Sequence, residues 1–450
     1  MKTIFITITG GTVARNILRT GILSYLLKDE NNRVVLLVPE KVDDYFIQEF
    51  SHPRVVFEKI PDIKNSSIRK FFTILFNGLT YTETEQRMLK FGGGDKGPES
   101  KSMYYIKHAT FSLISRVKIF KYIARWVEQY IFIEKDFDFL FEKYKPTLLF
   151  CSTMYSKLDV ILIKAGKRFK VFSISMPKSW DTVGRLFFRA PSDAIVVNNP
   201  FMKDWIVSEQ GLAGENIFIC GIPQFDVYKQ KTEFLTKGVF CSKTGLDPYK
   251  PIVLFASEGK WTWWDDAYVD ELIHKYNILK NYNLILRPHF SNLQEKKYHK
   301  FAHMKGVYID DTHLRTSRAF ADHWDPSREN MEWFAEVLHQ SSVVIAFMST
   351  VVLDAFACDR PVINLCYDLP VEGPTIPLKE LYNSVHFNAV RKENPTAIAE
   401  SAQEVMNWIE TCVREPNIFI QERQNTLHSI AYKIDGQSAK RVAEVILSHL

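Results

Sequence analysis

Short apolar runs alternate with helical patterns along most of the chain. The runs "TLLFCS" and "KVFSIS" are typical of buried strands, and "KLDVILIKAGKRF" between them has the spacing of an amphipathic helix. Parallel strands need such a crossover helix, whereas antiparallel strands can be joined by a tight turn. The alternation therefore predicts an α/β fold, in which doubly wound parallel sheets carry helices on both faces.

The alternation is interrupted between Ile222 and about Lys250, and it restarts at "PIVLFAS". A chain of 450 residues is long enough for two domains of this kind. We expect two Rossmann-like domains, residues 1–222 and 223–450, that face each other across a cleft. The final helical stretch, from Pro395 to Leu450, is long enough to cross back onto the first domain.

Residues 64–145 do not fit a minimal α/β domain and are predicted to form a helical insertion in the first domain. Apolar residues recur there at helical spacing, and basic residues lie off this apolar seam. Two interpretations remain open: the segment is a helix packed on its own domain, or it is a basic amphipathic surface that rests on an anionic membrane. The seam consists of Leu113, Val117, Phe120, Ala124, Val127 and Ile131, and the basic residues are Arg116, Lys118, Lys121 and Arg125.

Composition and charge argue against several classes of protein. The net charge of +5 is mild and no dense Lys/Arg block occurs, so a dedicated nucleic-acid binder is not expected. The six cysteines form no C-x-x-C pair and have no histidines at zinc spacing, so no metal site is predicted. "MKTIFITITGG" is typical of a first strand rather than a signal peptide, and no uncharged apolar run reaches the roughly 18 residues of a membrane span. We expect a cytoplasmic protein, or one peripheral to the inner face of the cytoplasmic membrane.

The stretch "AFMSTVVLDAFACDRPVINL" places Ser349 and Thr350 between an apolar strand and a helical pattern. Backbone N–H groups without partners gather where a helix begins, and the helix dipole favours negative charge there. Two hydroxyl side chains add donors, so the pattern indicates a phosphate site. Asp354 lies one helical turn further on, where its carboxylate could accept hydrogen bonds from ribose hydroxyls. The alternative is an ordinary N-cap.

Two further strand ends carry groups suited to a phosphorylated ligand. Arg287 and His289 occur in "LILRPHF"; the guanidinium could pair with a phosphate, and the imidazole could donate to a diphosphate or act as an acid. In "FASEGKWTWW", Ser257 and Glu258 follow a strand, and Trp261 could stack on a base or sugar. A local structural role is the alternative for each. Open α/β sheets bind ligands at the carboxyl ends of strands, which favours one common site for a phosphorylated ligand.

The first domain offers fewer candidates. Gly11 belongs to a tight turn after the first strand, where we predict a contact with the phosphorylated ligand. Arg15 follows in the first helical turn. "ITGGTVARNIL" lacks G-x-G-x-x-G, so the dinucleotide fingerprint is absent. Asp181 in "MPKSWDTVGRL", which also contains Arg185, is the candidate general base, and a helix-capping aspartate is the alternative.

Several motifs resemble known families. "CGIPQFDVY" resembles the G-x-P-x-x-D segment that leads into the second domain of GT-B glycosyltransferases and of CDP-glycerol glycerophosphotransferases. "LRPHF" resembles the RPHP element of the latter family. "SSVVIAFMSTVVLDAFACDRPVI" resembles the donor-binding strand–helix–strand of both families, and "IDGQSAKRVAEVIL" is similar to their closing helix. "SWDTVGR" resembles the SWDN segment of bacterial surface-polysaccharide transferases with the same fold.

The resemblance implies a GT-B fold with a nucleotide-donor site on the second domain and an acceptor site on the first. By position, Arg287 and His289 would meet the donor diphosphate. Ser349 and Thr350 would meet its phosphate, and Asp354 its ribose.

The sequence departs from these families at three places. Phe290 stands where RPHP has its second proline, and Thr182 stands where SWDN has asparagine. No first-domain histidine clearly matches the base of the glycerophosphotransferases, and His108 is a weak candidate. These departures count against transfer of a polyol phosphate.

We therefore expect a metal-independent glycosyltransferase that moves a sugar from a nucleotide-sugar donor to a bacterial surface-glycan acceptor, either a glycan or a lipid-linked intermediate. The glycan would belong to lipopolysaccharide, capsule or cell wall, and no cofactor beyond the activated donor is expected. A CDP-glycerol-type polyol-phosphate transferase and a nucleotide-sugar 2-epimerase are alternatives on the same scaffold. The alternative without catalysis is a membrane-associated scaffold protein.

Overall fold

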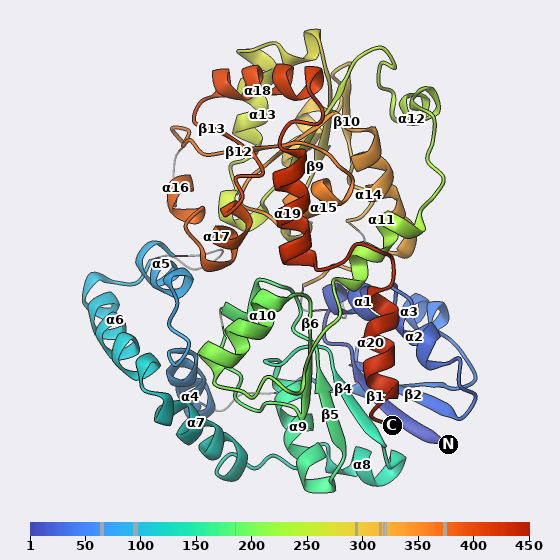
Figure 1. Cartoon of the computed structure of the whole chain (residues 1–450), viewed down its shortest axis with the longest axis vertical. Coiled ribbons are helices and arrows are strands. Elements are labelled where there is room, and N and C mark those ends of the chain that lie inside the picture. The colour runs from blue at the N-terminus through green and yellow to red at the C-terminus, as the bar shows by residue number, and fades with distance from the viewer. Residues whose placement is uncertain are drawn as a thin grey trace.

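The computed structural model describes residues 1–63, 67–92, 98–184, 186–292, 296–314, 317, 320, 322–371 and 376–450. Within these residues the strands form two parallel sheets that lie in separate halves of the molecule (Figure 1). Helices connect successive strands and cover both faces of each sheet. The predicted fold class, α/β with two doubly wound units, is confirmed.

In each sheet the strand that comes first in the chain lies in the interior, and the later strands lie on both sides of it. The first described sheet runs in the order β3 (Val55–Ile60), β2 (Asn32–Pro39), β1 (Lys2–Thr7), β4 (Leu148–Cys151), β5 (Phe172–Ser175), β6 (Ala194–Val197) and β7 (Ile217–Ile219). The second runs in the order β10 (Val307–Ile309), β9 (Asn283–Arg287), β8 (Ile252–Ala256), β11 (Val343–Ala346), β12 (Val362–Leu365) and β13 (Ala397–Ala399). The order therefore reverses beside β1 and β8, at the switch points where open α/β sheets bind ligands.

The helices follow the same division. The first unit contains α1 (Gly11–Ile17), α2 (Ile22–Leu26), α3 (Asp44–Glu49), α4 (Ser67–Asn77), α5 (Glu83–Phe91), α6 (Lys101–Arg116), α7 (Lys118–Tyr130), α8 (Asp138–Tyr144), α9 (Lys157–Phe169) and α10 (Pro200–Trp205). From the linker onward come α11 (Val227–Gln230), α12 (Lys237–Thr244), α13 (Asp266–His274), α14 (Arg328–Gln340), α15 (Val351–Ala357), α16 (Leu378–Leu381), α17 (Val385–Arg391), α18 (Ala402–Arg414), α19 (Ile420–Ala431) and α20 (Ser438–Leu447).

Apolar residues recur at helical spacing without interruption over residues 13–28 and 111–132, which predicts one helix in each stretch, but in the structure both helices are broken. The first, over 13–28, is divided into α1 and α2 at Gly21, whose φ of 98° lies outside the right-handed helical region. The second, over 111–132, is divided between α6 and α7 at Val117, which is extended. Periodicity carries across such breaks because the apolar spacing continues on both sides, so it could not locate them.

The last helix packs on the first sheet although it closes the chain. Val442 and Ile446 of α20 belong to the same apolar core as Ile4 of β1, and α20 lies beside α1 and α2 (Figure 1). The linker fixes this position, because the Asp226 carboxylate accepts the amides of Ser438 at 3.0 Å and Ala439 at 2.8 Å. The "CGIPQFDVY" segment and the closing helix are thus two parts of one contact.

The insertion between β3 and β4 contains α4–α8, and α4, α6 and α7 lie along the outer edge of the first unit (Figure 1). Charged groups attach it to the domain. Lys164 of α9 is fully buried and pairs with Glu128 at 2.8 Å and Glu134 at 2.5 Å, while Arg69 pairs with Glu128 at 2.6 Å. Burial alone would raise the pKa of Glu128, but Lys164, Arg189 and Arg69 lower it below its ordinary value.

The polar side of α7 faces the domain. Lys121 donates to the Glu209 carbonyl, and Arg125 donates to the carbonyls of Phe188 at 3.1 Å and Gln210 at 2.7 Å. The helix thus packs on its own domain, but mainly through this polar side rather than through the apolar seam, because periodicity identifies an apolar face without saying what covers it. Of the seam residues, Ala124 is buried and Val127 half-buried, whereas Leu113, Val117, Phe120 and Ile131 are exposed. Among the described helices, none has both the length and the apolar composition that crossing a bilayer requires.

We predict that Gly221→Ala destabilises the protein. Gly221 has a φ of 87°, and an added Cβ would lie 2.6 Å from Ser438 Oγ, beside the amides that bind Asp226. The free energy of unfolding, measured by denaturant titration, should fall by about 1–3 kcal/mol. Gly238→Ala in α12 is the matched control, because its Cβ would meet nothing within 4 Å, and it should leave stability unchanged or raise it by up to about 1 kcal/mol. Equal effects of the two substitutions would contradict this account of the linker.

Candidate functional site

Two adjoining cavities, of about 490 and 150 Å³, lie at the carboxyl ends of strands from both sheets. The larger is lined from the first domain by α1, α5 and the loop after β5, and from the second by the loops after β8, β9 and β11. We call the two cavities together the cleft. The residues that line both are Arg15, His289, Phe290, Trp324, Ser349 and Thr350.

Arg287 ends β9 and lines the smaller cavity. Its guanidinium forms an ion pair with the fully buried Asp310 carboxylate and lies 3.9 Å from the centre of the Phe334 ring. Asp310 is itself held by Trp333 Nε1 at 3.0 Å. These contacts fix the direction of the guanidinium, so that little side-chain entropy remains to be lost when an anion binds.

His289 lines both cavities just beyond Arg287. Its Nδ1 accepts the Ser291 amide at 3.1 Å, which leaves the proton of the neutral ring on Nε2. Burial, with Lys297 and Arg287 nearby, lowers the pKa of His289 to about 4. At neutral pH the ring is therefore an uncharged N–H donor, and an acid role requires a bound anion that raises the pKa.

Ser349 and Thr350 precede α15 and line both cavities. Thr350 is the N-cap, but its side chain makes no capping hydrogen bond in the described structure, so ordinary capping does not account for this hydroxyl. Asp354 lines the smaller cavity and accepts from the Tyr228 hydroxyl at 2.5 Å. Burial raises the pKa of Asp354 to about 6, although Tyr228 and Arg15 oppose the shift.

The other predicted donor contacts differ in their placement. Ser257 lines the smaller cavity, but its hydroxyl donates to the buried Asp265 carboxylate at 2.6 Å and so organises the turn. Glu258 lines the larger cavity. Gly11 is not part of the described lining, because an added Cβ would lie 1.4 Å from the Trp324 carbonyl oxygen that packs against it.

Asp181 lines the larger cavity from the first domain, in the loop between β5 and the turn at 182–184. Its neighbour Trp180 is buried and lies edge-on to His386, with ring centres 5.5 Å apart. Trp180 Nε1 has no hydrogen-bond partner among the described residues. Thr84 of α5 accepts the Val385 amide at 3.2 Å, so this part of the cleft is also built by both domains.

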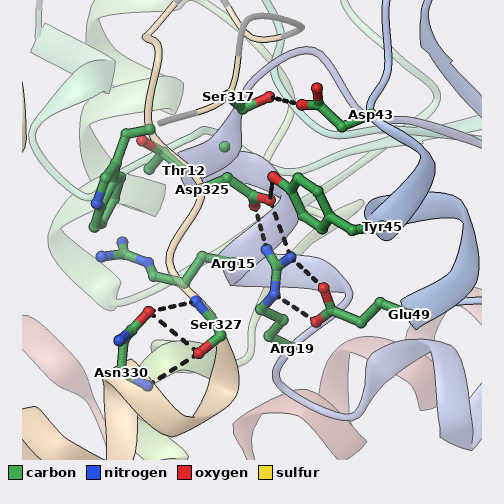
Figure 2. Close-up of polar contacts among 12 residues, drawn as sticks. Thr12, Arg15, Arg19, Asp43, Tyr45, Glu49, Ser317, Asp325, Ser327 and Asn330 are labelled. Atoms are coloured by element: carbon green, nitrogen blue, oxygen red, sulfur yellow. Dashed lines mark hydrogen bonds and ion pairs between the residues drawn. The ribbon is translucent and has the colours of Figure 1, made fainter. Parts of the chain in front are cut away.

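A segment of the second domain, residues 322–327, lies on the first domain beside the cleft; we call it the interdomain segment. Its Asp325 accepts from Arg19 at 2.6 Å and from the Tyr45 hydroxyl at 2.5 Å, and Glu49 holds the other edge of the same guanidinium (Figure 2). The side chains of Arg19 and Asp325 are almost completely buried, with exposed fractions of 1% and 0%.

Sequence reasoning missed Trp324, Arg87 and His386, which all line the larger cavity. They lie in a loop and on two helices far apart in the chain, and no motif marks them. The weak candidate His108 is on α6, where Nδ1 lies 2.9 Å from the Tyr81 hydroxyl, away from the cleft. Arg185 and the side chain of Trp261 lie outside the described residues.

The acidic pair of "YIDDTH" has partners in the protein. Asp310 pairs with Arg287, and Asp311 lies 3.3 Å from His299 Nε2. Within the described ranges, no group of three or more His, Cys, Asp or Glu side chains is arranged to hold a metal ion. Metal-independent chemistry stays a prediction.

Comparison with solved structures extends over nearly the whole chain. A glycosyltransferase from Rickettsia africae ESF-5 is 12% identical, with a TM-score of 0.50 over 99% of this chain and 98% of that one. A UDP-GlcNAc 2-epimerase from Neisseria meningitidis is 12% identical, with a TM-score of 0.52 over 100% of both chains. The wall teichoic acid polymerase TagF is 11% identical, with a TM-score of 0.50 over 99% of this chain and 88% of that one. At such low identity these similarities show the fold alone.

Comparison with curated proteins gives no match. The family model described as CDP-glycerol:poly(glycerophosphate) glycerophosphotransferase matches residues 184–448, which is more than half of the chain. The match includes the linker, the second sheet and the closing helix that crosses to the first. The chain therefore belongs to the CDP-glycerol:poly(glycerophosphate) glycerophosphotransferase family, and its fold is of the GT-B type.

Proposed function

We propose that this protein transfers a sugar from a nucleoside-diphosphate-sugar donor to a bacterial surface-glycan acceptor. One observation carries the proposal: Arg287, His289 and the Ser349–Thr350 pair, from the ends of separate strands, line a cleft that Asp181 reaches from the other domain. The donor diphosphate would lie against the second domain. The structurally similar epimerase from N. meningitidis is bound to UDP-GlcNAc, and TagF was soaked with CDPG. Both observations support a nucleotide-activated donor for this protein.

Arg287 and the Nε2–H of His289 would stabilise the negative charge that develops on the leaving nucleoside diphosphate. The hydroxyls of Ser349 and Thr350 would donate to its phosphate oxygens, and Asp354 would accept from the ribose. These groups meet the charge of the leaving group without a metal ion. Because they are held by the protein beforehand, the reaction needs little rearrangement around the charge that forms.

Asp181 would act as the general base. As the acceptor hydroxyl oxygen bonds to the anomeric carbon, the bond from that carbon to the diphosphate oxygen breaks and its electron pair leaves with the nucleoside diphosphate. Asp181 takes the hydroxyl proton. Contact between the two domains around the cleft would exclude water and so limit hydrolysis of the donor.

Transfer of a polyol phosphate is the second candidate, and the family match favours it. In that reaction the acceptor hydroxyl attacks the β-phosphorus of CDP-glycerol, and CMP leaves. Against it, the described residues that line the cleft from the first domain include no histidine. A 2-epimerase would instead convert a UDP-sugar with no acceptor present.

We also propose that the helical insertion rests on an anionic membrane. Aromatic and aliphatic side chains are exposed on α4, α6 and α7, including Trp126 at 56% and Leu113 at 67%. Every exposed charged side chain between residues 101 and 135 is Lys or Arg. Apolar side chains flanked by cations suit an anionic lipid surface. The protein would then act at the cytoplasmic face of the membrane, on a lipid-linked or nascent glycan.

The product released from each donor tests the function. With a panel of nucleotide sugars and acceptor glycans we expect release of a nucleoside diphosphate, whereas CMP release from CDP-glycerol would establish the second candidate instead.

Arg287→Gln should weaken nucleoside-diphosphate binding by about 1.5–3 kcal/mol, because a charge-assisted hydrogen bond is lost. Lys305→Gln, an exposed cation of the same domain, should not. Calorimetric titration with UDP and CDP measures both.

Asp181→Asn should lower kcat by about 10²–10⁴ while UDP or CDP affinity stays within about twofold, because the amide cannot take the acceptor proton. Single-turnover assays and calorimetry on the same samples separate the two effects. Asp204→Asn, an exposed aspartate of α10, is the matched control. An unchanged kcat for Asp181→Asn would remove Asp181 from the reaction.

Binding to vesicles tests the membrane proposal. The protein should sediment with phosphatidylglycerol-containing vesicles, less with phosphatidylcholine alone, and less as salt rises. Ile123→Glu with Trp126→Glu should reduce binding about tenfold, since two apolar side chains no longer insert. Tyr249→Glu, at a tyrosine 94% exposed in the second domain, should bind like the wild type. A dimer in sedimentation analysis that the double variant abolishes would instead assign this face to self-association.

A further inference from the structure

The interdomain segment is anchored on the first domain on both sides of Trp324. Before it, the Asp322 carboxylate accepts the amides of Gly11 at 3.0 Å and Thr12 at 3.1 Å. After it, Asp325 forms the buried pair with Arg19 (Figure 2). Between these anchors the Trp324 backbone packs so closely on Gly11 that no side chain fits there. The position of Trp324 is therefore set by the first domain, although the residue belongs to the second.

Contacts within the second domain fix the indole as well. Trp324 Nε1 donates to the His313 carbonyl at 2.8 Å, and the ring stacks on Phe290 at 4.4 Å with an interplanar angle of 16°. Only 5% of the residue is exposed, yet it lines both cavities. With so little exposed surface and one ring neighbour already stacked, Trp324 is poorly suited to act as a stacking platform for a base. Its position suits support of a neighbouring side chain.

That neighbour is Arg15 of the first domain. Its guanidinium carbon lies 5.2 Å from the centre of the Trp324 ring, within the range of a cation–π contact. Nε donates to Asn16 at 3.0 Å, and the side chain lines both cavities. Arg15 therefore adds a cation from the first domain to the cavities that the second-domain donors also line.

The electrostatic surroundings of Arg15 suit an anionic ligand. Burial lowers the pKa of Arg15, and the nearby Arg287 cation acts in the same direction, while Asp354, Tyr228 and Asp322 oppose them. Two arginines near one cavity repel each other, and a bound diphosphate would relieve that repulsion.

We propose that Trp324 is a positioning residue that holds Arg15 of the first domain toward the diphosphate of a donor bound mainly by the second. The inference rests on the proposed nucleoside-diphosphate ligand and adds that its recognition requires both domains. Arg15 touches the diphosphate, whereas Trp324 acts through Arg15. The interdomain segment thereby couples donor affinity to the contact between the domains.

A double-mutant cycle tests this coupling, with UDP and CDP as calorimetric probes. Arg15→Gln should weaken binding roughly tenfold or more, because a charged donor is lost. Trp324→Leu should weaken it roughly three- to tenfold. The double variant should match Arg15→Gln alone rather than show the product of the two losses, because Trp324 has nothing left to position. Trp324→Phe keeps an aromatic face and should stay within about threefold of wild type.

Trp408→Leu is the matched control, because Trp408 lies on α18 outside the described lining. It should lower the unfolding temperature without changing UDP or CDP affinity. If Trp324→Leu does not fold, Asp325→Asn replaces it in the cycle with the same expectation, since it loosens the anchor outside the cleft.

Multiplicative losses in the cycle, or wild-type affinity for Trp324→Leu, would overturn the positioning role while the donor site remains. If the wild type binds neither UDP nor CDP, both the donor site and this inference fall.

Discussion

The attachment of the interdomain segment to the first domain is the contact on which the cleft depends. Arg19 and Asp325 are removed from water almost completely, and such a pair is tolerated only when each charge is fully satisfied. Tyr45 and Glu49 supply the remaining partners, one for each member of the pair. Since both cavities are lined by both domains, this contact and the docking of α20 determine the shape of the site.

The two domains contribute different side chains to the cleft. The second domain supplies hydrogen-bond donors and cations whose directions are fixed before any ligand arrives, as the ion pair of Arg287 with Asp310 illustrates. The depressed pKa of His289 and the elevated pKa of Asp354 have the same cause, burial that disfavours charge. A bound polyanion would raise both pKa values, moving that of His289 back toward its ordinary value and that of Asp354 further above its own, so protonation and ligand binding are linked at this site.

The helical insertion reverses the usual distribution of polar and apolar groups. Lys121, Arg125 and Glu128 face the domain, where main-chain carbonyls and Lys164 satisfy them, while aromatic and aliphatic side chains face outward. Burying charges requires compensating partners, which the domain provides. An outward apolar face lowers free energy only when something covers it, and this is why we propose that a membrane covers the insertion.

The sequence by itself determined the local order of strands and helices, because apolar periodicity and crossover connections leave few ways to build a parallel sheet. It also indicated Arg287, His289, Ser349 and Thr350, because each lies at or just after the carboxyl end of a strand, where open α/β sheets bind ligands. Only the tertiary structure decided the rest. The breaks at Gly21 and Val117, the outward face of α7 and the place of Trp324 beside Arg15 depend on contacts between residues far apart in the chain. Local spacing cannot encode these contacts, since the energy that fixes them is gained only when the two domains and the insertion come together.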